Sequence, residues 1–530
     1  MSPSSSVPVN KLDRKHPLWH LHSDQWNTID LLYESGVRLK NNGVNLLMKR
    51  PKELYDVYQE RYRRLTYQDI LANAIRWYLA KMFQTEAKID PKTDDERFAA
   101  FLQDCDRSGT TYSVFARDLL ETMMLYQVGW VLIDKPSAVD LPIPINTRAD
   151  EKRAGLDQPY LVLYEPRQVI NWQTDRYGNL NWAVIKTTTG SQESFLADPE
   201  QTVDWWAFDL NNYYHYQYKL DKSKQVSEMS IFSDESAKWA GASNASATLV
   251  DSGPHVLSQW DRVPIRSCSL PKSLWFTNAC YLQLCEHLDF LNSYTWKLFM
   301  ACFPQLMIYS DKEITGTTMG ETSFLQLGAQ DKAEYLEPDG KSFAECRQYL
   351  EMLRMEIYRD FHLQAQAKTS TATADGASGY SKEVDMAPAN DVLNALGSNL
   401  RSYQQLLLED FKLAAGMPLN ETTRPDVNGY HFDEKPAFQQ IGTAQAAKDL
   451  GLNDKSPTLE KILYKDAAMP LLNGQNEEIK KKVLAEIDSA PTDKEQADAE
   501  QQQQRQMFEQ RLAKMSTTET LHEESGAEAA

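Results

Sequence analysis

The sequence predicts an α+β protein, mainly helical. Apolar residues recur at helical spacing before residue 127 and again after residue 273, and short apolar runs with turn residues lie between them. Between Pro271 and Pro304 the chain has neither proline nor glycine. A helix of about 45 Å could occupy this stretch at 1.5 Å per residue.

Length and charge set the first limits on function. The chain has 530 residues and a formal net charge of −19, so several domains are expected and a typical sequence-independent DNA-binding surface is disfavoured, because such a surface is basic. A strongly acidic protein can still let DNA slide past without sticking. Simple solubility explains the charge equally well.

Cysteines and apolar windows give no sign of a cofactor or a membrane anchor. The six cysteines contain no C-x-x-C pair, which disfavours zinc and fits a reducing cytoplasm. Residues 1–10 have no apolar core typical of a secretory signal, and no uncharged apolar window reaches 18 residues. We therefore expect no cofactor, no metal and no membrane contact.

The first half is predicted as helices followed by strands. Trp26, Ile29, Leu32 and Tyr33 open a helical region at residues 23–127. Residues 221–254, rich in Ser, Ala and Lys, are predicted to be an excursion from the fold. Strands are expected at residues 130–133, 160–164, 169–172, 181–186, 203–208 and 213–220.

Two long helices with a small β module between them are predicted after residue 273. The first occupies the stretch between Pro271 and Pro304. The apolar stripe of the first consists of Leu284, Leu288 and Leu291, and that of the second of Leu350, Leu353 and Ile357. Strands are expected between them at residues 305–309, 324–327 and 333–336.

A loop, a third long helix and a C-terminal region complete the chain. Residues 367–386 can bury little apolar surface, so a mobile loop is expected there. The third helix should begin near Pro388, kink at Gly397 and end at Gly416. A short strand at residues 430–432, three small helices and an acidic, Gln-rich disordered tail should follow.

Motifs for catalysis or ligand binding are weak throughout. Asp134 ends an apolar strand, as a magnesium-binding Asp does in ATPases, but no phosphate-binding glycine loop accompanies it, so a capped core strand is favoured. His16, His20 and His22 are expected on an exposed N-terminus. The run 61–64, Arg-Tyr-Arg-Arg, fits either a nucleic-acid groove or, preferably, a solvated helix face. No catalytic residue is predicted.

The order of these segments resembles tailed-bacteriophage portal proteins of the siphophage and myophage type. The resemblance covers roughly residues 25–490, and no single motif carries it. The matching stretches are residues 33–37, 55–64, 116–120, 129–136, 159–162, 170–172 and 263–265.

The resemblance implies a division of the chain into portal segments. These are an N-terminal arm (1–24), wing (25–272), first stem helix (273–303), clip (304–340), second stem helix (341–366), tunnel loop (367–387), kinked helix with return to the wing (388–439), crown (440–487) and acidic tail (488–530). The candidate DNA-channel residues on the tunnel loop are Lys368, Tyr380 and Lys382.

The resemblance also implies a function and partners. Portal proteins form a homo-oligomeric ring, typically dodecameric, at one capsid vertex, where double-stranded DNA is packaged and ejected. They contact the terminase large subunit, the head–tail adaptor and the major capsid protein. The expected location is thus the virion, and the host cytoplasm during assembly. The alternatives are a magnesium-dependent nucleic-acid-processing enzyme and a non-channel helical virion scaffold or adaptor.

Overall fold

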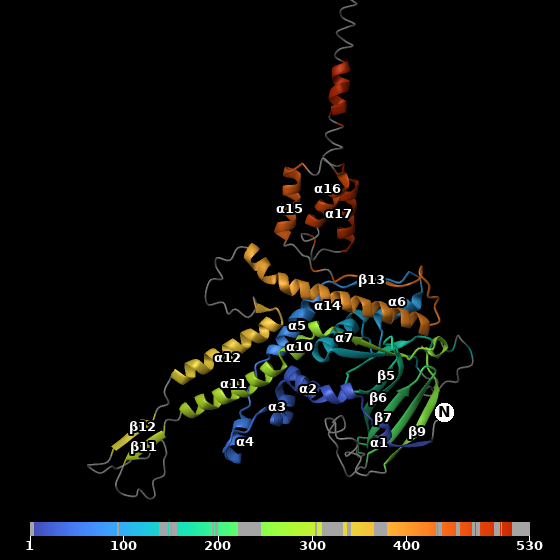
Figure 1. Cartoon of the computed structure of the whole chain (residues 1–530). Helices are drawn as coiled ribbons and strands as arrows, with labels where there is room; N and C mark the ends of the chain where they lie inside the picture. The colour runs from blue at the N-terminus through green and yellow to red at the C-terminus, as the bar shows by residue number, and fades with distance from the viewer. Residues whose placement is uncertain are drawn as a thin grey trace, which may run out of the picture. The chain divides into compact units, whose positions relative to one another are not determined.

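The computed structural model shows an α+β protein, mainly helical, as the sequence predicts (Figure 1). The chain divides into two compact units, Met1–Phe432 and Asp433–Ala530, which are described separately. Residues 5–510 are described except for 93–94, 137–146, 148–149, 151–155, 193–194, 197–199, 221–244, 303–304, 310–331, 337–340, 365–378, 431, 433–436, 452–455, 469–471, 473–476, 492–498 and 500.

The N-terminal residues belong to the fold, so the predicted separate arm at 1–24 is wrong. Strand β1 (Ser6–Pro8) pairs with β9 (Ser246–Pro254), and helix α1 (Val9–Leu12) follows it. Helix α2 (Pro17–Glu34) buries Trp19 completely. The buried Lys186 amino group lies 2.6 Å from Asp13 Oδ1, and this ion pair joins the N-terminus to the large sheet.

The predicted helical region at 23–127 is confirmed. Its apolar faces supply much of the first unit's core, including the fully buried Leu71, Ile75 and Tyr78. After α2 the elements are α3 (Gly36–Asn42), the 3-10 turn η1 (Gly43–Leu46), α4 (Tyr55–Arg63), α5 (Ile70–Met82), strand β2 (Lys88–Asp90), α6 (Glu96–Gln103) and α7 (Tyr112–Tyr126).

Two antiparallel sheets follow these helices. The larger has the strand order β1-β9-β8-β7-β6-β5, and the smaller has the order β10-β3-β4. The excursion predicted at residues 221–254 is wrong for Ser246–Pro254, because these residues form β9 and pair with β8. Residues 221–244 lie outside the described residues. The strands are β3 (Val128–Asp134), β4 (Tyr160–Tyr164), β5 (Val169–Thr174), β6 (Leu180–Ser191), β7 (Glu200–Phe208), β8 (Asn212–Lys219) and β10 (Ile265–Ser269).

The first long helix is shorter than residues 273–303. A turn (η5, Lys272–Leu274) and a short helix (α10, Phe276–Ala279) precede α11 (Tyr281–Ala301). The cause is contact with α7: Trp275 Nε1 donates to Leu125 O at 3.0 Å and Thr277 Oγ1 donates to Met124 O at 2.8 Å. These bonds hold the start of the segment against the core.

The second long helix, α12 (Lys341–Asp360), also ends before the predicted residue 366. His362 has a φ of 54°, and Leu363 N donates to Tyr358 O, which closes the helix end. Strands β11 (Gln305–Tyr309) and β12 (Lys332–Leu336) pair antiparallel between the two helices, as predicted. The predicted strand at 324–327 lies outside the described residues.

The third long helix, α14 (Gly379–Ala414), begins well before Pro388, which lies inside it. The predicted loop at 367–387 is therefore wrong from Gly379 onward. Gly416, with a φ of 68°, ends the helix region as predicted. The predicted strand at 430–432 lies instead at β13 (Asp426–Asn428), which pairs with β2 rather than with the middle sheets.

Gly397 has a packing role in α14. A Cβ atom at this position would lie 2.5 Å from Tyr430 Cβ and 3.0 Å from the Tyr430 carbonyl oxygen. The chain after β13 thus approaches the helix at a point where only glycine leaves room. This close contact explains why residue 397 is glycine, and the kink expected there stays a prediction.

The second unit contains the predicted small helices of the crown region, 440–487. They are α15 (Ala437–Asp449), α16 (Pro457–Ala468) and α17 (Glu477–Ser489). Lys465 Nζ lies 2.6 Å from Asp488 Oδ1 and links α16 to α17. Within the predicted disordered tail, 488–530, residues 501–510 are helical.

We predict that Gly397→Ala lowers the free energy of unfolding by about 1–3 kcal/mol, because the new methyl group overlaps the Tyr430 backbone. Urea denaturation of the full chain measures the change. Gly442→Ala is the matched control, since a Cβ atom added to this helical glycine would have no other atom within 4 Å. Equal stability of Gly397→Ala and wild type would contradict the packing role.

Candidate functional site

The chain between α2 and α5 carries a charge opposite to that of the whole protein. We define the basic segment as residues 36–64, which contain eight basic and three acidic residues and so carry +5. Because the chain has a net charge of −19, all other residues together carry −24. The exposed basic residues of the segment are Lys40, Lys49, Arg50, Lys52, Arg63 and Arg64.

Large apolar side chains on the same segment are also exposed. Val37 is 74% exposed, Leu54 73% and Met48 70%, and Tyr55 is 65% exposed. Single exposed apolar residues are common on protein surfaces, whereas several on one short segment indicate a binding surface. Sequence reasoning missed this surface, although the local excess of basic residues was visible.

Arg61 holds the basic segment in one conformation. Its side chain is 1% exposed, and its Nε and Nη2 atoms donate to the two carboxylate oxygens of Glu53 at 3.1 Å each. Nη2 also donates to Met48 O, and Nη1 lies 3.7 Å from Asp289 Oδ1. Burial opposes ionisation of Glu53, but the hydrogen bonds from Arg61 and from the Arg50 backbone, together with the charges of both arginines, lower the pKa of Glu53.

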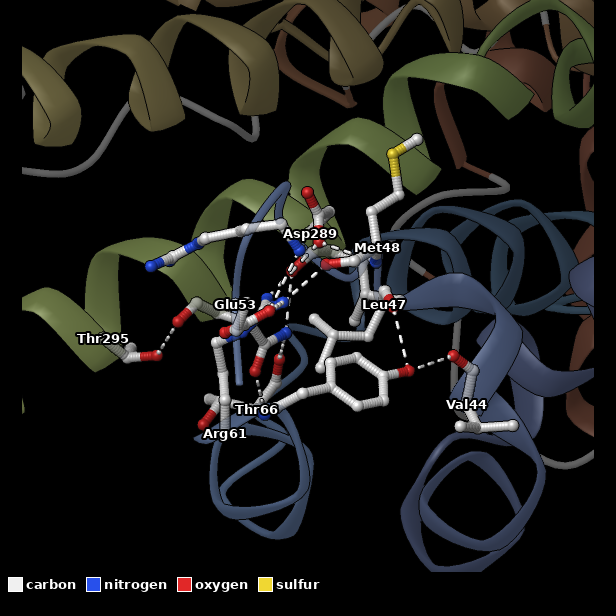
Figure 2. A network of polar contacts seen from close by, with 12 residues as sticks. Val44, Leu47, Met48, Glu53, Arg61, Thr66, Asp289 and Thr295 are labelled. Atoms are coloured by element: carbon white, nitrogen blue, oxygen red, sulfur yellow. Dashed lines mark hydrogen bonds and ion pairs between the residues drawn. The ribbon is translucent and has the colours of Figure 1, made fainter. Parts of the chain in front are cut away.

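Helix α11 supplies the other half of this network (Figure 2). Asp289 Oδ1 accepts from Met48 N at 3.1 Å. One turn later, Asn292 accepts from Thr66 N at 2.8 Å and donates to Thr66 O at 2.9 Å. The middle of the basic segment, at Met48, and the residue Thr66 just after it are therefore both bound to α11.

The run at residues 61–64 fits the expected solvated helix face only in part. Arg61 is buried and paired. Contact of the run with nucleic acid stays a prediction. Arg63 and Arg64 are exposed and pair with Glu60 of the same helix. The Arg64 guanidinium lies 3.8 Å from the centre of the Phe299 ring.

A small pocket opens where the basic segment meets α11. Its volume is about 160 Å³, well below the roughly 300–1,000 Å³ of ordinary small-molecule sites. It is large enough for one protein side chain. The lining residues are Arg61, Arg64, Thr66, Asn292, Thr295, Trp296 and Phe299.

The six predicted packing residues of the long helices are all buried within one chain, as expected from their spacing. Leu284, Leu288 and Ile357 belong to the main core, and the other three, Leu291, Leu350 and Leu353, are also buried. α11 and α12 run side by side, with β11 and β12 beyond their ends (Figure 1).

Away from the core, the two helices are joined by polar and aromatic contacts. Lys297 Nζ donates to Ser342 Oγ at 2.6 Å, and the rings of Phe290 and Tyr349 lie 4.8 Å apart, edge to face. Trp296, Phe299 and Tyr349 are only partly covered here. This part of the pair therefore offers aromatic surface to a neighbouring molecule.

The predicted channel residues are not placed on a common loop. Lys368 lies outside the described residues, whereas Tyr380 and Lys382 fall in the first turn of α14, where a loop was expected. Their role in contacting DNA stays a prediction.

The histidines near the N-terminus have structural partners. His16 caps α2 by accepting from Leu18 N at 3.2 Å, and its ring stacks on Trp172 with centres 3.9 Å apart. Among the residues that the structure describes, no group of three or more His, Cys, Asp or Glu side chains could hold a metal ion. In the same residues, no helix has the length and hydropathy needed to cross a bilayer.

Asp134, the candidate magnesium ligand, ends the buried strand β3. Burial raises the pKa of its carboxyl group to about 6, and the hydrogen bond from Lys135 N opposes this only in part. Within the described part of the chain, Asp134 belongs to no cluster of three potential metal ligands. The capped core strand is therefore the better description of Asp134.

Comparison with known proteins adds no relative. No protein-family model matches the chain, and no curated protein matches it significantly. The geometry of the chain itself is thus the basis for the function proposed below.

We predict that Arg61→Met lowers the free energy of unfolding by about 3–5 kcal/mol, because the buried Glu53 carboxylate loses its partner. Chemical denaturation measures the loss. Arg63→Met is the matched control, since Arg63 is 76% exposed and should change stability by less than about 0.5 kcal/mol. Equal effects of the two substitutions would contradict the anchoring role of Arg61.

We predict that Asp134→Asn gains stability over wild type as the pH rises from about 4 to 7. The folded wild type keeps a proton on Asp134 up to about pH 6, whereas the unfolded chain loses it near pH 4. Stability of the wild type thus falls across this window, by at most about 3 kcal/mol, and asparagine removes the fall. Melting temperatures against pH test this, and parallel curves would contradict it.

Proposed function

We propose that the protein is a portal-type channel subunit, which assembles into a ring through which double-stranded DNA passes at one capsid vertex. The observation that carries the proposal is the arrangement of α11 and α12. Two long helices lie side by side and are joined by the β11–β12 pair, and a third long helix follows them. This order corresponds to stem, clip, stem and channel helix in the family that the sequence resembles.

The burial of side chains along α11 supports assembly of several copies, because a single copy leaves apolar side chains of this helix exposed to solvent. Its first half packs into the core through Leu284 and Leu288. Other apolar side chains of the helix are exposed, Leu282 to 75%, Met300 to 45% and Leu298 to 37%. A helix that is buried on one face and carries exposed apolar residues elsewhere gains stability when neighbouring copies cover them.

The charge of the chain is compatible with passage of DNA. With a net charge of −19 per copy, a ring would repel phosphates over most of its surface. DNA could then move without being held by many simultaneous ionic contacts. In this proposal the terminase large subunit and the head–tail adaptor bind at the β11–β12 end, and the ring contacts the major capsid protein.

Electron microscopy of the purified full chain tests the proposal. Rings with a central opening, and labelled chain at a single vertex of assembled particles, are the expected results. Compact monomers with magnesium-dependent nuclease activity would overturn it in favour of a nucleic-acid-processing enzyme.

We predict that Leu353→Asp prevents ring formation and lowers the free energy of unfolding by more than about 3 kcal/mol. Leu353 is 5% exposed between the long helices, so an aspartate there would be buried without a partner. Met352→Asp is the control, because the adjacent Met352 is 48% exposed. Native mass spectrometry and melting curves measure both effects, and a normal ring with Leu353→Asp would contradict the stem assignment.

A further inference from the structure

We propose that the basic segment, residues 36–64, is the docking surface for a second copy of this chain, and that it binds an acidic surface elsewhere on that copy. The inference rests on the proposed ring. It adds which surface of the subunit makes the contact and how the two surfaces differ.

The first argument is the exposed apolar surface on the basic segment. Val37, Met48 and Leu54 are each at least 70% exposed, although their backbone lies in or beside ordered helices. Aliphatic side chains gain little from contact with phosphates, whereas a protein surface can cover them. The occupant favoured by these side chains is therefore a protein and not a nucleic acid.

The second argument is charge. The segment carries +5 in a chain whose other residues together carry −24, so the rest of a second copy is acidic on average. Attraction between the basic segment and an acidic surface of that copy offsets part of the repulsion between two acidic chains.

The third argument is symmetry. Two basic segments facing each other across a two-fold axis would place +5 against +5, so a symmetric contact of the segment with itself is disfavoured. The contact must then join two different surfaces, the basic segment of one copy and an acidic surface of the other. In the proposed ring such contacts run head to tail, and they close when the rotation fits.

The fourth argument is that the surface is already held in place. Arg61 binds Glu53 and Met48. On α11, Asp289 binds Met48 and Asn292 binds Thr66 just after the segment. Little conformational entropy is lost when such a surface docks. The adjoining pocket of about 160 Å³ beside Arg64 and Phe299 accepts one side chain of the second copy as an anchor.

Two sets of substitutions in the full chain test the surface. The apolar variant is Val37→Ser with Met48→Ser and Leu54→Ser, and the charge variant is Lys40→Glu with Lys49→Glu and Arg50→Glu. We expect each to weaken assembly at least tenfold in native mass spectrometry and light scattering, with an unchanged melting temperature of the single chain.

Matched controls separate the surface from general effects. Tyr177→Ser with Phe195→Ser and Leu196→Ser removes three apolar residues that are 73–90% exposed elsewhere. Lys480→Glu with Lys481→Glu and Lys482→Glu makes the same charge change outside the segment. Both controls should assemble like wild type, and equal weakening by a control and its paired variant would overturn the inference.

A photo-crosslinking residue at Leu54 gives an independent readout in an otherwise unchanged chain. Capture of a peptide from an acidic surface of a second copy supports the inference. The inference would be overturned if rings formed without capture. It would also be overturned if the wild type bound phosphatidylserine vesicles and the charge variant lost this binding but still formed rings.

If the wild type forms no ring, the proposed function fails as well. If both variants form rings like the wild type, only the inference about the basic segment is contradicted.

Discussion

The attachment of α11 to its surroundings is the constraint on which the rest of the first unit depends. Leu284 and Leu288 fix one end of the helix in the core, while Asp289 binds Met48 of the basic segment and Asn292 binds Thr66 just after it. The same helix therefore packs on α12 and orders a surface that is distant from it in sequence. If α11 rotated, apolar core contacts and polar contacts to residues 48 and 66 would be lost together.

Helical and strand spacing was sufficient to predict the elements, because apolar periodicity reflects burial along one chain. The long helices, the β11–β12 pair and the strands from β3 to β8 follow from it. The first and last residues of these elements could not be predicted from the spacing, because contacts with residues distant in sequence determine them. Trp275 and Thr277 bind the end of α7 and interrupt the first long helix, and α14 continues through Pro388, where a start was the local expectation.

The candidate site was less predictable than the fold for the same reason. Arg61 belongs to a run of basic residues that looks solvated, and only its partners on residues 53, 48 and 289 make it a buried anchor. The close contact of Gly397 with Tyr430, 33 positions along the chain, was likewise not visible in the sequence. In both cases the partners lie outside the helical spacing from which the elements were predicted, so that spacing could not identify them.

The basic segment shows that the charge of the chain is unevenly distributed, which the net charge alone does not reveal. A uniformly acidic subunit would repel its neighbours at every approach, whereas one basic face selects one orientation of approach. The contact selected in this way joins two different surfaces, because the basic face repels its own copy. In the proposed ring, the distribution of charge, and not its total, would let acidic subunits join while the remaining surface still repelled the phosphates of DNA.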